Sequence, residues 1–187
     1  MVEVELRGWQ AMRVLHPRPA VIVISRSEKG RVNGCAVSWI TPVNVDPPII
    51  ALSLAYSRLT YEYVKESGEA TINVLPADAY EAVHYVGRVS GREVPDKLIK
   101  AGFQLVPSRA VSTPHIDGAA AYIEAVLRDE LKYPDHAILT FEALRTVANS
   151  RYFKTVFKEE NPVLLHAGGD TYVVRYEYVK ASNPAST

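Results

Sequence analysis

The sequence predicts a mainly β domain with short α-helices, in which a closed antiparallel barrel carries the helices on its periphery. Runs of Val, Ile, Leu, Tyr and Thr recur along the chain and are bounded by Gly, Pro, Asn and Asp, as strands usually are. No helical stretch separates the first three runs, whereas a doubly wound parallel sheet needs a full helix between successive strands. The length of 187 residues suits one hydrophobic core. We therefore expect a single domain over residues 1–187, with its core at about residues 17–178.

The expected strands follow from the apolar runs. The densest run is AVIVI at residues 20–24, which predicts a buried strand followed by a turn. Residues 40–48 contain three prolines, so we expect a loop without regular ladder bonds there. Two long runs joined by Tyr133-Pro-Asp135 predict an antiparallel hairpin, although their Ala, Glu and Leu content also permits helix. The expected strands are residues 20–24, 31–39, 49–54, 70–75, 119–132, 136–148, 163–166 and 171–178.

The expected helices are short. One covers residues 60–66 and is ended by Gly68. A second runs from about residue 76 to about residue 86 and carries its apolar side chains on one face. A third covers residues 96–101. The polar tail from residue 181 onward is expected to fray.

The charge balance excludes one class of function. The chain has 21 basic and 21 acidic residues, so its formal net charge is zero and its pI is about 7.0. Proteins that bind nucleic acids usually carry a basic excess that neutralises phosphates, so we expect no nucleic-acid partner. A net charge near zero also leaves little repulsion between copies of the chain, which permits self-association.

Cysteine usage and hydropathy indicate a cytoplasmic protein. Cys35 is the only cysteine, which excludes an intramolecular disulfide framework and a cysteine-based structural zinc site. The N-terminal sequence lacks the uninterrupted apolar segment of a signal peptide. The longest apolar runs, residues 20–24 and 49–52, are too short to cross a bilayer. We therefore expect a cytoplasmic location and no membrane association.

Residues 33–48 form the densest group of unusual side chains. Asn33-Gly34 permits left-handed backbone and the close approach of a ligand. The small residues Gly34, Cys35 and Ala36 would let a flat ring lie against exposed main-chain N–H groups. The alternative is a bulged strand followed by a proline-rich turn, and both interpretations are open on this segment alone.

Two further groups have the chemistry of anion binding. YSRLT at residues 56–60 combines hydroxyls and an arginine directly before a predicted helix, as phosphate sites do. The alternative is an ordinary N-cap at Ser57 or Thr60 beside a solvated arginine. Around the loop from Ser90 to Lys97, Lys97 and either Arg88 or Arg92 would add positive charge for an anionic ligand. Polar loops are common without such a role, so this signal alone leaves both interpretations open.

The sequence has no motif for catalysis by protein side chains or by a metal. It contains no G-x-S-x-G, no P-loop and no G-x-G-x-x-G, and its five histidines lack metal-ligand spacing. We expect neither a catalytic side chain nor a metal site. Cys35 has no recognisable base nearby and is interpreted as a small buried apolar residue. His136 and His166 stand at strand ends, where they either face a pocket or serve the fold.

Taken in order, these groups resemble the flavin reductase-like family of FMN-binding split barrels. The similarity covers most of the chain, from Pro17-Arg-Pro19 to about Tyr172. No single motif is specific to the family, whereas the ordered series is. The remaining elements of that series are Asn33-Gly34, Ser38-Trp39, Thr41-Pro42, Asp46-Pro47-Pro48, Ser57-Arg-Leu-Thr60, Ser90-Gly91, Asp96-Lys97, Gly102-Phe103, Pro114-x-Ile116, Asp135-His136 and Pro162-Val-Leu-Leu-His166.

The resemblance implies a Greek-key split barrel, usually a homodimer, that holds FMN without a covalent bond near the subunit interface. Family members commonly transfer a hydride from NADH or NADPH to flavin, and the reduced flavin serves a monooxygenase partner, ferric complexes or another acceptor. Residues 33–38 would lie along the isoalloxazine and ribityl, with the SRLT segment and its helix at the phosphate. The implied cofactor-binding residues are Asn33, Gly34, Cys35, Ala36, Ser38, Trp39, Thr41, Ser57, Arg58, Thr60, Ser90, Lys97, His136 and His166.

We therefore expect an FMN-binding oxidoreductase that transfers a hydride from NADH or NADPH to flavin. Transfer of a hydride to flavin is the cofactor's own chemistry, which explains the lack of a catalytic motif. One alternative is an FMN-binding electron carrier that a protein partner reduces. Another is a barrel without flavin that serves as an assembly or ligand-binding module.

Overall fold

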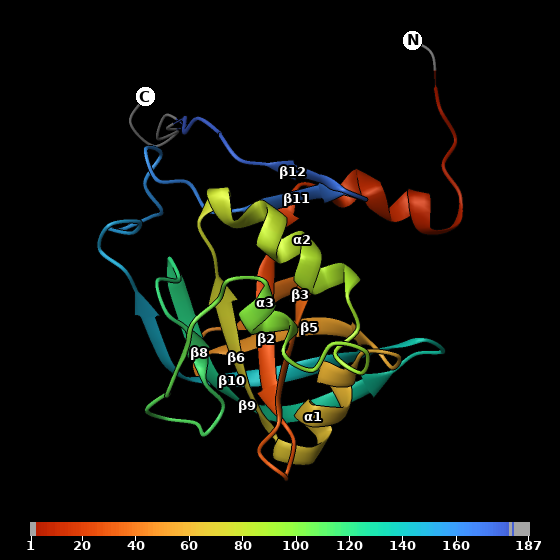
Figure 1. The fold of residues 1–187 in the computed structure, drawn as a ribbon. Helices are drawn as coiled ribbons and strands as arrows, with labels where there is room; N and C mark the ends of the chain where they lie inside the picture. The colour runs from red at the N-terminus through yellow and green to blue at the C-terminus, as the bar shows by residue number, and fades with distance from the viewer. Residues whose placement is uncertain (1–2, 180, 182–187) are drawn as a thin grey trace.

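An antiparallel sheet of seven strands forms the body of the computed structural model, which describes residues 3–179 and 181 (Figure 1). The strands lie in the order β3-β2-β6-β9-β10-β5-β4, and each neighbouring pair is antiparallel. The predicted mainly β fold is thereby confirmed. The strands of this sheet are β2 (Val21–Arg26), β3 (Val32–Val37), β4 (Ile40–Asn44), β5 (Ile49–Ala55), β6 (Glu69–Val74), β9 (Ala121–Lys132) and β10 (His136–Ala148).

The sheet is open, so the prediction of a closed barrel is wrong on this point. Its edges are β3 and β4, which do not pair with each other within residues 3–179 and 181. Only Ser38 and Trp39 separate the two strands in the chain, and β4 pairs with β5. The helices α1 (Leu59–Ser67), α2 (Tyr80–Arg88) and α3 (Lys97–Lys100) all contact β3. Helices therefore cover the edge that a closing strand would otherwise occupy.

The prediction of a loop at residues 40–48 is also wrong, because β4 lies within it. Pro42 is opposite Ile50 in the ladder with β5, and the register shifts between Pro42 and Asn44. A proline has no N–H to donate, but an edge strand has no second neighbour that requires the bond. Prolines in this segment are therefore compatible with an edge strand and exclude only a central one.

Strand β2 is buried on both faces, and this divides the interior into two cores. Successive side chains of a strand point to opposite faces, so Val21 and Val23 enter one core while Ile22 and Ile24 enter the other. The inner core lies inside the curved sheet and the outer core lies between the sheet and α2. The inner core comprises Val21, Val23, Cys35, Val37, Leu52, Leu54, Val64, Ala70, Ile72, Ala125, Ala137, Leu139 and Phe141. The outer core comprises Ala20, Ile22, Ile24, Leu75, Val83, Val86, Leu98, Ile116, Ala119 and Leu164.

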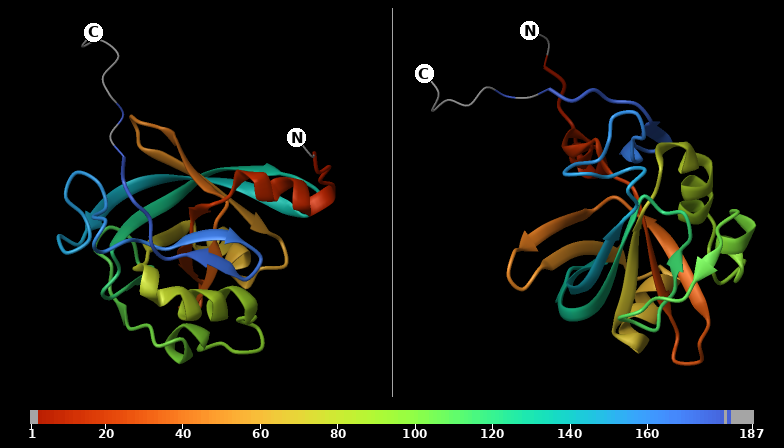
Figure 2. Two further views of the ribbon diagram at one scale, coloured as in Figure 1. Left: turned by 90° about the horizontal axis from the view of Figure 1, so that it is seen from above. Right: turned by 90° about the vertical axis from the view of Figure 1, so that its left-hand side faces the viewer.

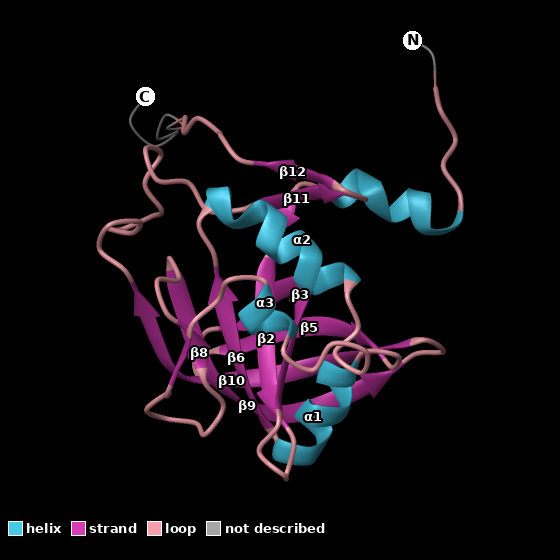
Figure 3. Ribbon diagram, viewed as in Figure 1, coloured by secondary structure: helices cyan, strands magenta, loops and turns pink. Residues whose placement is uncertain are grey.

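The helices form where the sequence predicts them. Helix α1 contributes Val64 to the inner core and ends at Gly68, whose φ of 68° is left-handed and costs glycine little. Helix α2 follows a short 3₁₀ turn, η2 (Ala77–Ala79), and buries Val83 and Val86. Figure 3 shows both α2 and α3 on the outer side of the sheet. Within the described residues, no helix is long and apolar enough to cross a membrane.

Two small sheets and an N-terminal 3₁₀ helix complete the fold. The strands β1 (Arg18–Pro19), β11 (Leu165–Gly168) and β12 (Thr171–Val173) form one small sheet beside α2 (Figure 2). The strands β7 (Leu105–Val106) and β8 (His115–Ile116) form the other. The helix η1 (Gly8–Leu15), which the sequence analysis does not predict, precedes β1. The strand expected at residues 171–178 ends at residue 173, and the expected frayed tail lies, except for residue 181, outside the described residues.

Replacing Phe141 by alanine is expected to lower the free energy of unfolding by about 3–5 kcal/mol, because the cavity left in the inner core cannot collapse fully. Phe141 is fully buried on β10. Leu144→Ala is the matched control, since Leu144 lies on the same strand with 44% of its surface exposed. Urea unfolding of both variants measures the difference, and equal losses would contradict the assigned core.

Candidate functional site

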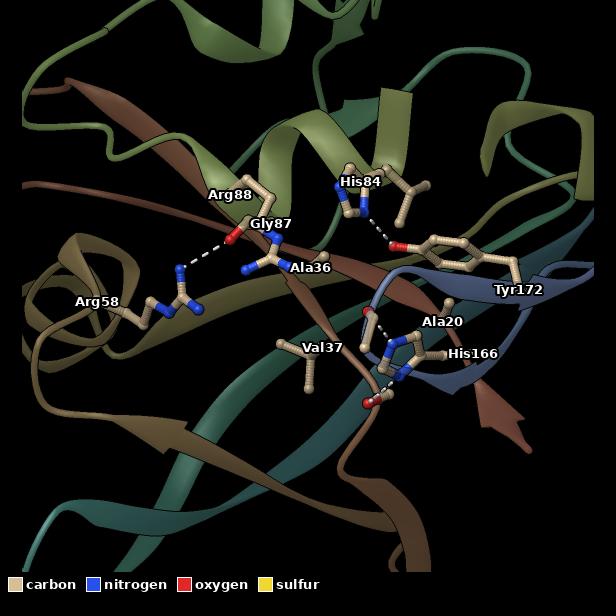
Figure 4. Close-up of a pocket in the computed structure, with 12 residues that line it drawn as sticks. Ala20, Ala36, Val37, Arg58, His84, Gly87, Arg88, His166 and Tyr172 are labelled. Carbon is tan, nitrogen blue, oxygen red and sulfur yellow. Dashed lines mark hydrogen bonds between the residues drawn. The ribbon is translucent and has the colours of Figure 1, made fainter. Parts of the chain in front are cut away.

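A cavity of about 240 Å³ lies between the end of β3, the helix α2 and the β11–β12 hairpin (Figure 4). Four residues predicted for the site line it, namely Ala36, Ser38, Arg58 and His166. They come from segments far apart in the sequence, and only the fold brings them together. This space is called the β3–α2 cavity below.

The floor of the cavity is the small-residue end of β3. Ala36 faces α2, and the two elements are so close that a Cβ on Gly87 would lie 3.1 Å from the Cβ of Ala36. Val37 and Ser38 follow at the point where the chain leaves the strand. Small side chains at this end of β3 leave its main chain accessible to a flat ligand.

Arg58 provides positive charge at one end of the cavity. It is the N-cap of α1, and its Nη1 donates to the main-chain oxygen of Gly87 at 2.9 Å. No side chain caps the N-terminus of this nine-residue helix, so the first-turn N–H groups have no intrahelical partner. An exposed guanidinium beside such a helix end suits an anion such as a phosphate.

Helix α2 contributes His84 and Arg88 to the cavity. Arg88 is one of the arginines that the sequence indicates as a source of positive charge for an anion, whereas His84 is not predicted for the site. Nδ1 of His84 lies 3.3 Å from the hydroxyl of Tyr172. Arg88 forms an ion pair with Asp170, and this bond holds the pKa of the Asp170 carboxyl below its ordinary value. The spacing of four residues places His84 on the same helix face as Arg88, and this spacing is the sequence signal that would have identified His84.

His166 closes the opposite end of the cavity. Its Nε2 lies 3.0 Å from the oxygen of Gly169, and its Nδ1 lies 3.3 Å from Oγ of Ser38. A carbonyl only accepts, so Nε2 of His166 donates to the oxygen of Gly169. The two bonds fix the ring at the cavity wall, where it also packs against His16 with ring centroids 5.1 Å apart.

Three predicted residues form a buried chain outside the cavity. Nδ2 of Asn33 donates to Oγ1 of Thr60 at 2.7 Å, and Thr60 in turn bonds Cys35. All three side chains are buried. Burial raises the pKa of the Cys35 thiol, while the bond from Thr60 opposes this shift. Cys35 is therefore a neutral thiol within the inner core.

Gly34 and Lys97 also contact other parts of the protein interior. A Cβ on Gly34 would lie 3.1 Å from Leu98. The group that approaches this glycine closely is therefore a side chain of the outer core. The Nζ of Lys97 donates to the oxygens of Val86 at 2.9 Å and Val89 at 2.8 Å. These oxygens belong to the C-terminal end of α2, where a positive charge is favoured. Desolvation by burial lowers the pKa of Lys97 from its ordinary value of 10.5.

The remaining predicted residues lie apart from the β3–α2 cavity. Trp39 stacks on His136 with ring centroids 5.4 Å apart, beside β4, which also carries the exposed Thr41. Ser57 is exposed next to Arg58. The hydroxyl of Ser90 accepts from the main-chain N–H of Arg92 at 3.2 Å.

Comparison with known proteins decides the family. The flavin reductase like domain matches residues 12–172, which is most of the chain. The chain belongs to the flavin reductase-like family. The resemblance found in the sequence is confirmed.

Relatives of the family are found in archaea and bacteria. An uncharacterized protein of Aeropyrum pernix is 34% identical over 137 residues, which is 73% of this chain and 52% of that protein. An uncharacterized protein of Pyrococcus abyssi is 31% identical over 135 residues, covering 72% of this chain and 76% of the relative. A probable flavin reductase of Rhizobium meliloti is 27% identical over 63% of this chain and 36% of its own length. The chain thus spans about half the length of the Aeropyrum relative and about a third of the Rhizobium protein.

Solved structures share the split-barrel fold of the family. The FMN-binding protein of Thermus thermophilus with bound 1-cyclohex-2-enone superposes with a TM-score of 0.83 at 23% identity, covering 97% of this chain and 98% of that one. Flavoredoxin of Desulfovibrio vulgaris gives 0.80 at 22% identity over 92% and 94% of the two chains. Nitrilotriacetate monooxygenase component B of Bacillus cereus gives 0.82 at 19% identity over 97% and 98%.

The buried Lys97 is expected to make the stability of the protein rise with pH. In the interval between its lowered folded-state pKa and 10.5, the unfolded chain binds more protons than the folded one, so the free energy of unfolding increases with pH there. Lys97→Met removes this contribution. Urea unfolding between neutral and alkaline pH is expected to show a growing stability difference in favour of the natural chain.

Lys100→Met is the control for the loss of one lysine from the same helix, because Lys100 is exposed and pairs with Asp96. The free energy of unfolding is plotted against pH for the natural chain and for Lys97→Met. If the two curves stay parallel across this pH range, the titration of Lys97 is not coupled to folding.

Proposed function

We propose that this chain is an FMN-binding oxidoreductase that transfers a hydride from NADH or NADPH to flavin. The observation that carries the proposal is the convergence, in the β3–α2 cavity, of the small-residue end of β3 with Arg58 at the start of α1. A flat ring system and a phosphate need these two features side by side. The family and its FMN-binding structural neighbours support FMN as the cofactor.

The residues of the cavity fit FMN in chemical type. Arg58 and the uncapped helix end would hold the phosphate, whose two negative charges favour charge-assisted bonds. Ser57 stands beside Arg58 and would add a hydroxyl. Ala36 to Ser38 would lie along the isoalloxazine and ribityl. For Asn33, Gly34, Cys35, Trp39, Thr41, Thr60, Ser90, Lys97 and His136, contact with the flavin stays a prediction.

When bound, FMN would supply the hydride acceptor, so the protein needs no side chain that makes or breaks covalent bonds. Arg58 would bind and neutralise the phosphate. The apolar side chains of Ala36, Val37 and Val83 would exclude water from the ring. The hydrogen bond between Ser38 and His166 would hold both side chains at the cavity wall, and the two side chains in these fixed positions would orient the cofactor.

We further propose a homodimer. None of the eight residues of η1 is buried, although Trp9, Met12, Val14 and Leu15 are apolar. Its C-terminal end is nevertheless fixed to the body, since Arg18 donates to the oxygens of Leu15 and Met12. An exposed apolar segment held in place suits a contact with a second copy, and the zero net charge permits one. Sedimentation velocity separates this dimer from a 20.7 kDa monomer.

Reduced flavin would pass its electrons to a monooxygenase partner, a ferric complex or another acceptor. Relatives of several kinds share the fold, among them a monooxygenase component and flavoredoxins. The alternative function is an electron carrier that a protein partner reduces. The two functions differ in the electron donor, which is a nicotinamide nucleotide in the first and a protein in the second.

The purified protein is expected to be yellow, and NADH or NADPH is expected to bleach its visible flavin absorbance under anaerobic conditions. Anaerobic titration of the protein with each nicotinamide, followed by absorbance, makes the measurement. Bleaching by a reduced protein donor with no response to either nicotinamide would establish the carrier and overturn the proposed reaction. A colourless protein that takes up no added FMN would indicate the module without flavin.

Arg58→Ala is expected to weaken FMN binding about 10- to 150-fold, because one charge-assisted bond to the phosphate contributes about 1.5–3 kcal/mol. Quenching of flavin fluorescence on titration gives the dissociation constant. Arg109→Ala is the matched control, since Arg109 is an exposed arginine outside the cavity. An unchanged constant for Arg58→Ala would remove this residue from the phosphate site.

A further inference from the structure

A second cavity has a volume of about 820 Å³, against about 240 Å³ for the β3–α2 cavity. Its walls are the chain around the start of α2, the segment from residue 151 to residue 162, and residues 174–177 after β12. Each wall contributes one tyrosine, namely Tyr80, Tyr152 and Tyr176. We call this space the tyrosine groove. Among the described residues, none lines both cavities, and residues 174–177 lie beyond the part of the chain that the family domain matches.

The walls of the tyrosine groove are bonded to one another. The main-chain N–H of Ala77 donates to the oxygen of Pro162 at 2.9 Å. The main-chain N–H of Val163 donates to the hydroxyl of Tyr176 at 3.1 Å, and Pro76 pairs with Val163 in an isolated antiparallel bridge. A ligand that enters the groove therefore meets walls that are already in place, as ligands do at most binding sites.

The tyrosine groove carries more negative than positive charge. Four exposed carboxylates line it, and none of them forms an ion pair within residues 3–179 and 181. They belong to Asp78, Glu159, Glu160 and Glu177. The two arginines that also line the groove, Arg151 and Arg175, balance only half of this charge. The excess of carboxylates attracts a cationic ligand.

One guanidinium already lies on a tyrosine ring of the groove. The Cζ atom of Arg151 is 5.4 Å from the centroid of the Tyr152 ring, which is within the range of a cation–π contact. Tyr80 is 41% exposed, and no cation of the described residues lies over its ring. A planar guanidinium stacks on an aromatic ring while its N–H groups donate to carboxylates nearby. Tyr80 is therefore a second position for the same contact, in a groove whose carboxylates form no ion pair.

We propose that the tyrosine groove docks an arginine-bearing segment of a partner protein. An arginine of that segment would stack on Tyr80, and its guanidinium would donate to the carboxylates of Glu159 and Glu160. Arginine fits this groove better than lysine, because an ammonium has no planar face to lie on the ring. The inference goes beyond the proposed function and does not depend on it, since the groove and the β3–α2 cavity are lined by different residues.

The position of the groove suits a partner that works with the β3–α2 cavity. Tyr80 lines the groove and His84 lines the cavity, and these two residues are about one turn of α2 apart. Figures 1 and 2 show the start of α2 and the chain after β12 on a side of the molecule away from η1. A second copy bound at η1 would therefore leave the groove open to another protein.

Isothermal titration calorimetry with two short peptides tests the proposal. In one peptide arginine alternates with glycine, and in the other lysine does. The arginine peptide is expected to bind the full chain about 10-fold more tightly than the lysine peptide, because only the guanidinium stacks. Tyr80→Leu is expected to remove this preference. Tyr133→Leu is the matched control, since Tyr133 is 50% exposed and lies outside the groove.

The carboxylates of the groove are tested with two double variants. Glu159→Gln combined with Glu160→Gln is expected to weaken binding of the arginine peptide about 10-fold, since two ion pairs are lost. Glu28→Gln combined with Asp129→Asn changes the net charge equally outside the groove and is expected to leave the dissociation constant unchanged. All the exchanged side chains are exposed, so we expect every variant to fold, which circular dichroism checks.

The docking of an arginine segment would be overturned if the arginine peptide did not bind or if both peptides bound equally well. Equal loss of affinity in the two double variants would also overturn it, because general attraction of charge would then explain the binding. Self-association in sedimentation velocity that the exchange of Glu159 and Glu160 abolishes would assign the groove to a second copy instead. The proposed function fails separately, since flavin absorbance reports FMN binding whatever the peptides do.

Discussion

The burial of β2 on both faces is the constraint on which the rest of the structure depends. A strand with Val21 and Val23 on one side and Ile22 and Ile24 on the other needs apolar cover twice. The curved sheet supplies one cover and α2 with α3 supplies the other. Strand β3 pairs with β2 and lies at the sheet edge, so the covering helices reach across it. The β3–α2 cavity lies where that cover ends.

The same packing decides what the cations near the site can do. Helix α2 must lie close to β3, and its C-terminal carbonyls then point toward neighbouring segments. Lys97 and Arg58 both donate to these carbonyls, at Val86, Val89 and Gly87. Lys97 is buried in this role, whereas Arg58 is exposed and open to solvent at the cavity. Two residues that look alike in the sequence thus have different access to an anion.

Most strands could be predicted because their information is local. The run at residues 20–24 and the long hairpin of β9 and β10 are visible in composition and period alone. Strand β4 is not predicted, because a proline excludes a strand only where a second neighbouring strand requires an N–H at its position. The open sheet is not predicted either, since the pairing of β3 with β4 would be a contact between two edges that are distant in the sheet, and no local pattern reports such a contact.

The site was predictable only in part, because it is formed by contacts between segments that lie far apart in the sequence. Arg58, Ser38 and His166 stand in motifs whose order indicates the family, and the cavity brings them together. Arg88 is a candidate because of its charge, whereas His84 has no such signal, since the pattern of this helix indicates only its apolar face. The position of Lys97 beneath α2 depends on how α3 packs, and the sequence around Lys97 does not contain that information.

The hydrogen bond from Arg58 to Gly87 has a consequence for recognition at this cavity. The guanidinium already has an acceptor, at the end of a helix whose dipole favours it. A guanidinium has five N–H donors, and this bond uses one of them, so the others stay available to an anion. The bond therefore holds the long side chain in one position before a ligand arrives. Less conformational entropy is then lost on binding, and the cavity favours an anion that fits the donors as they already lie.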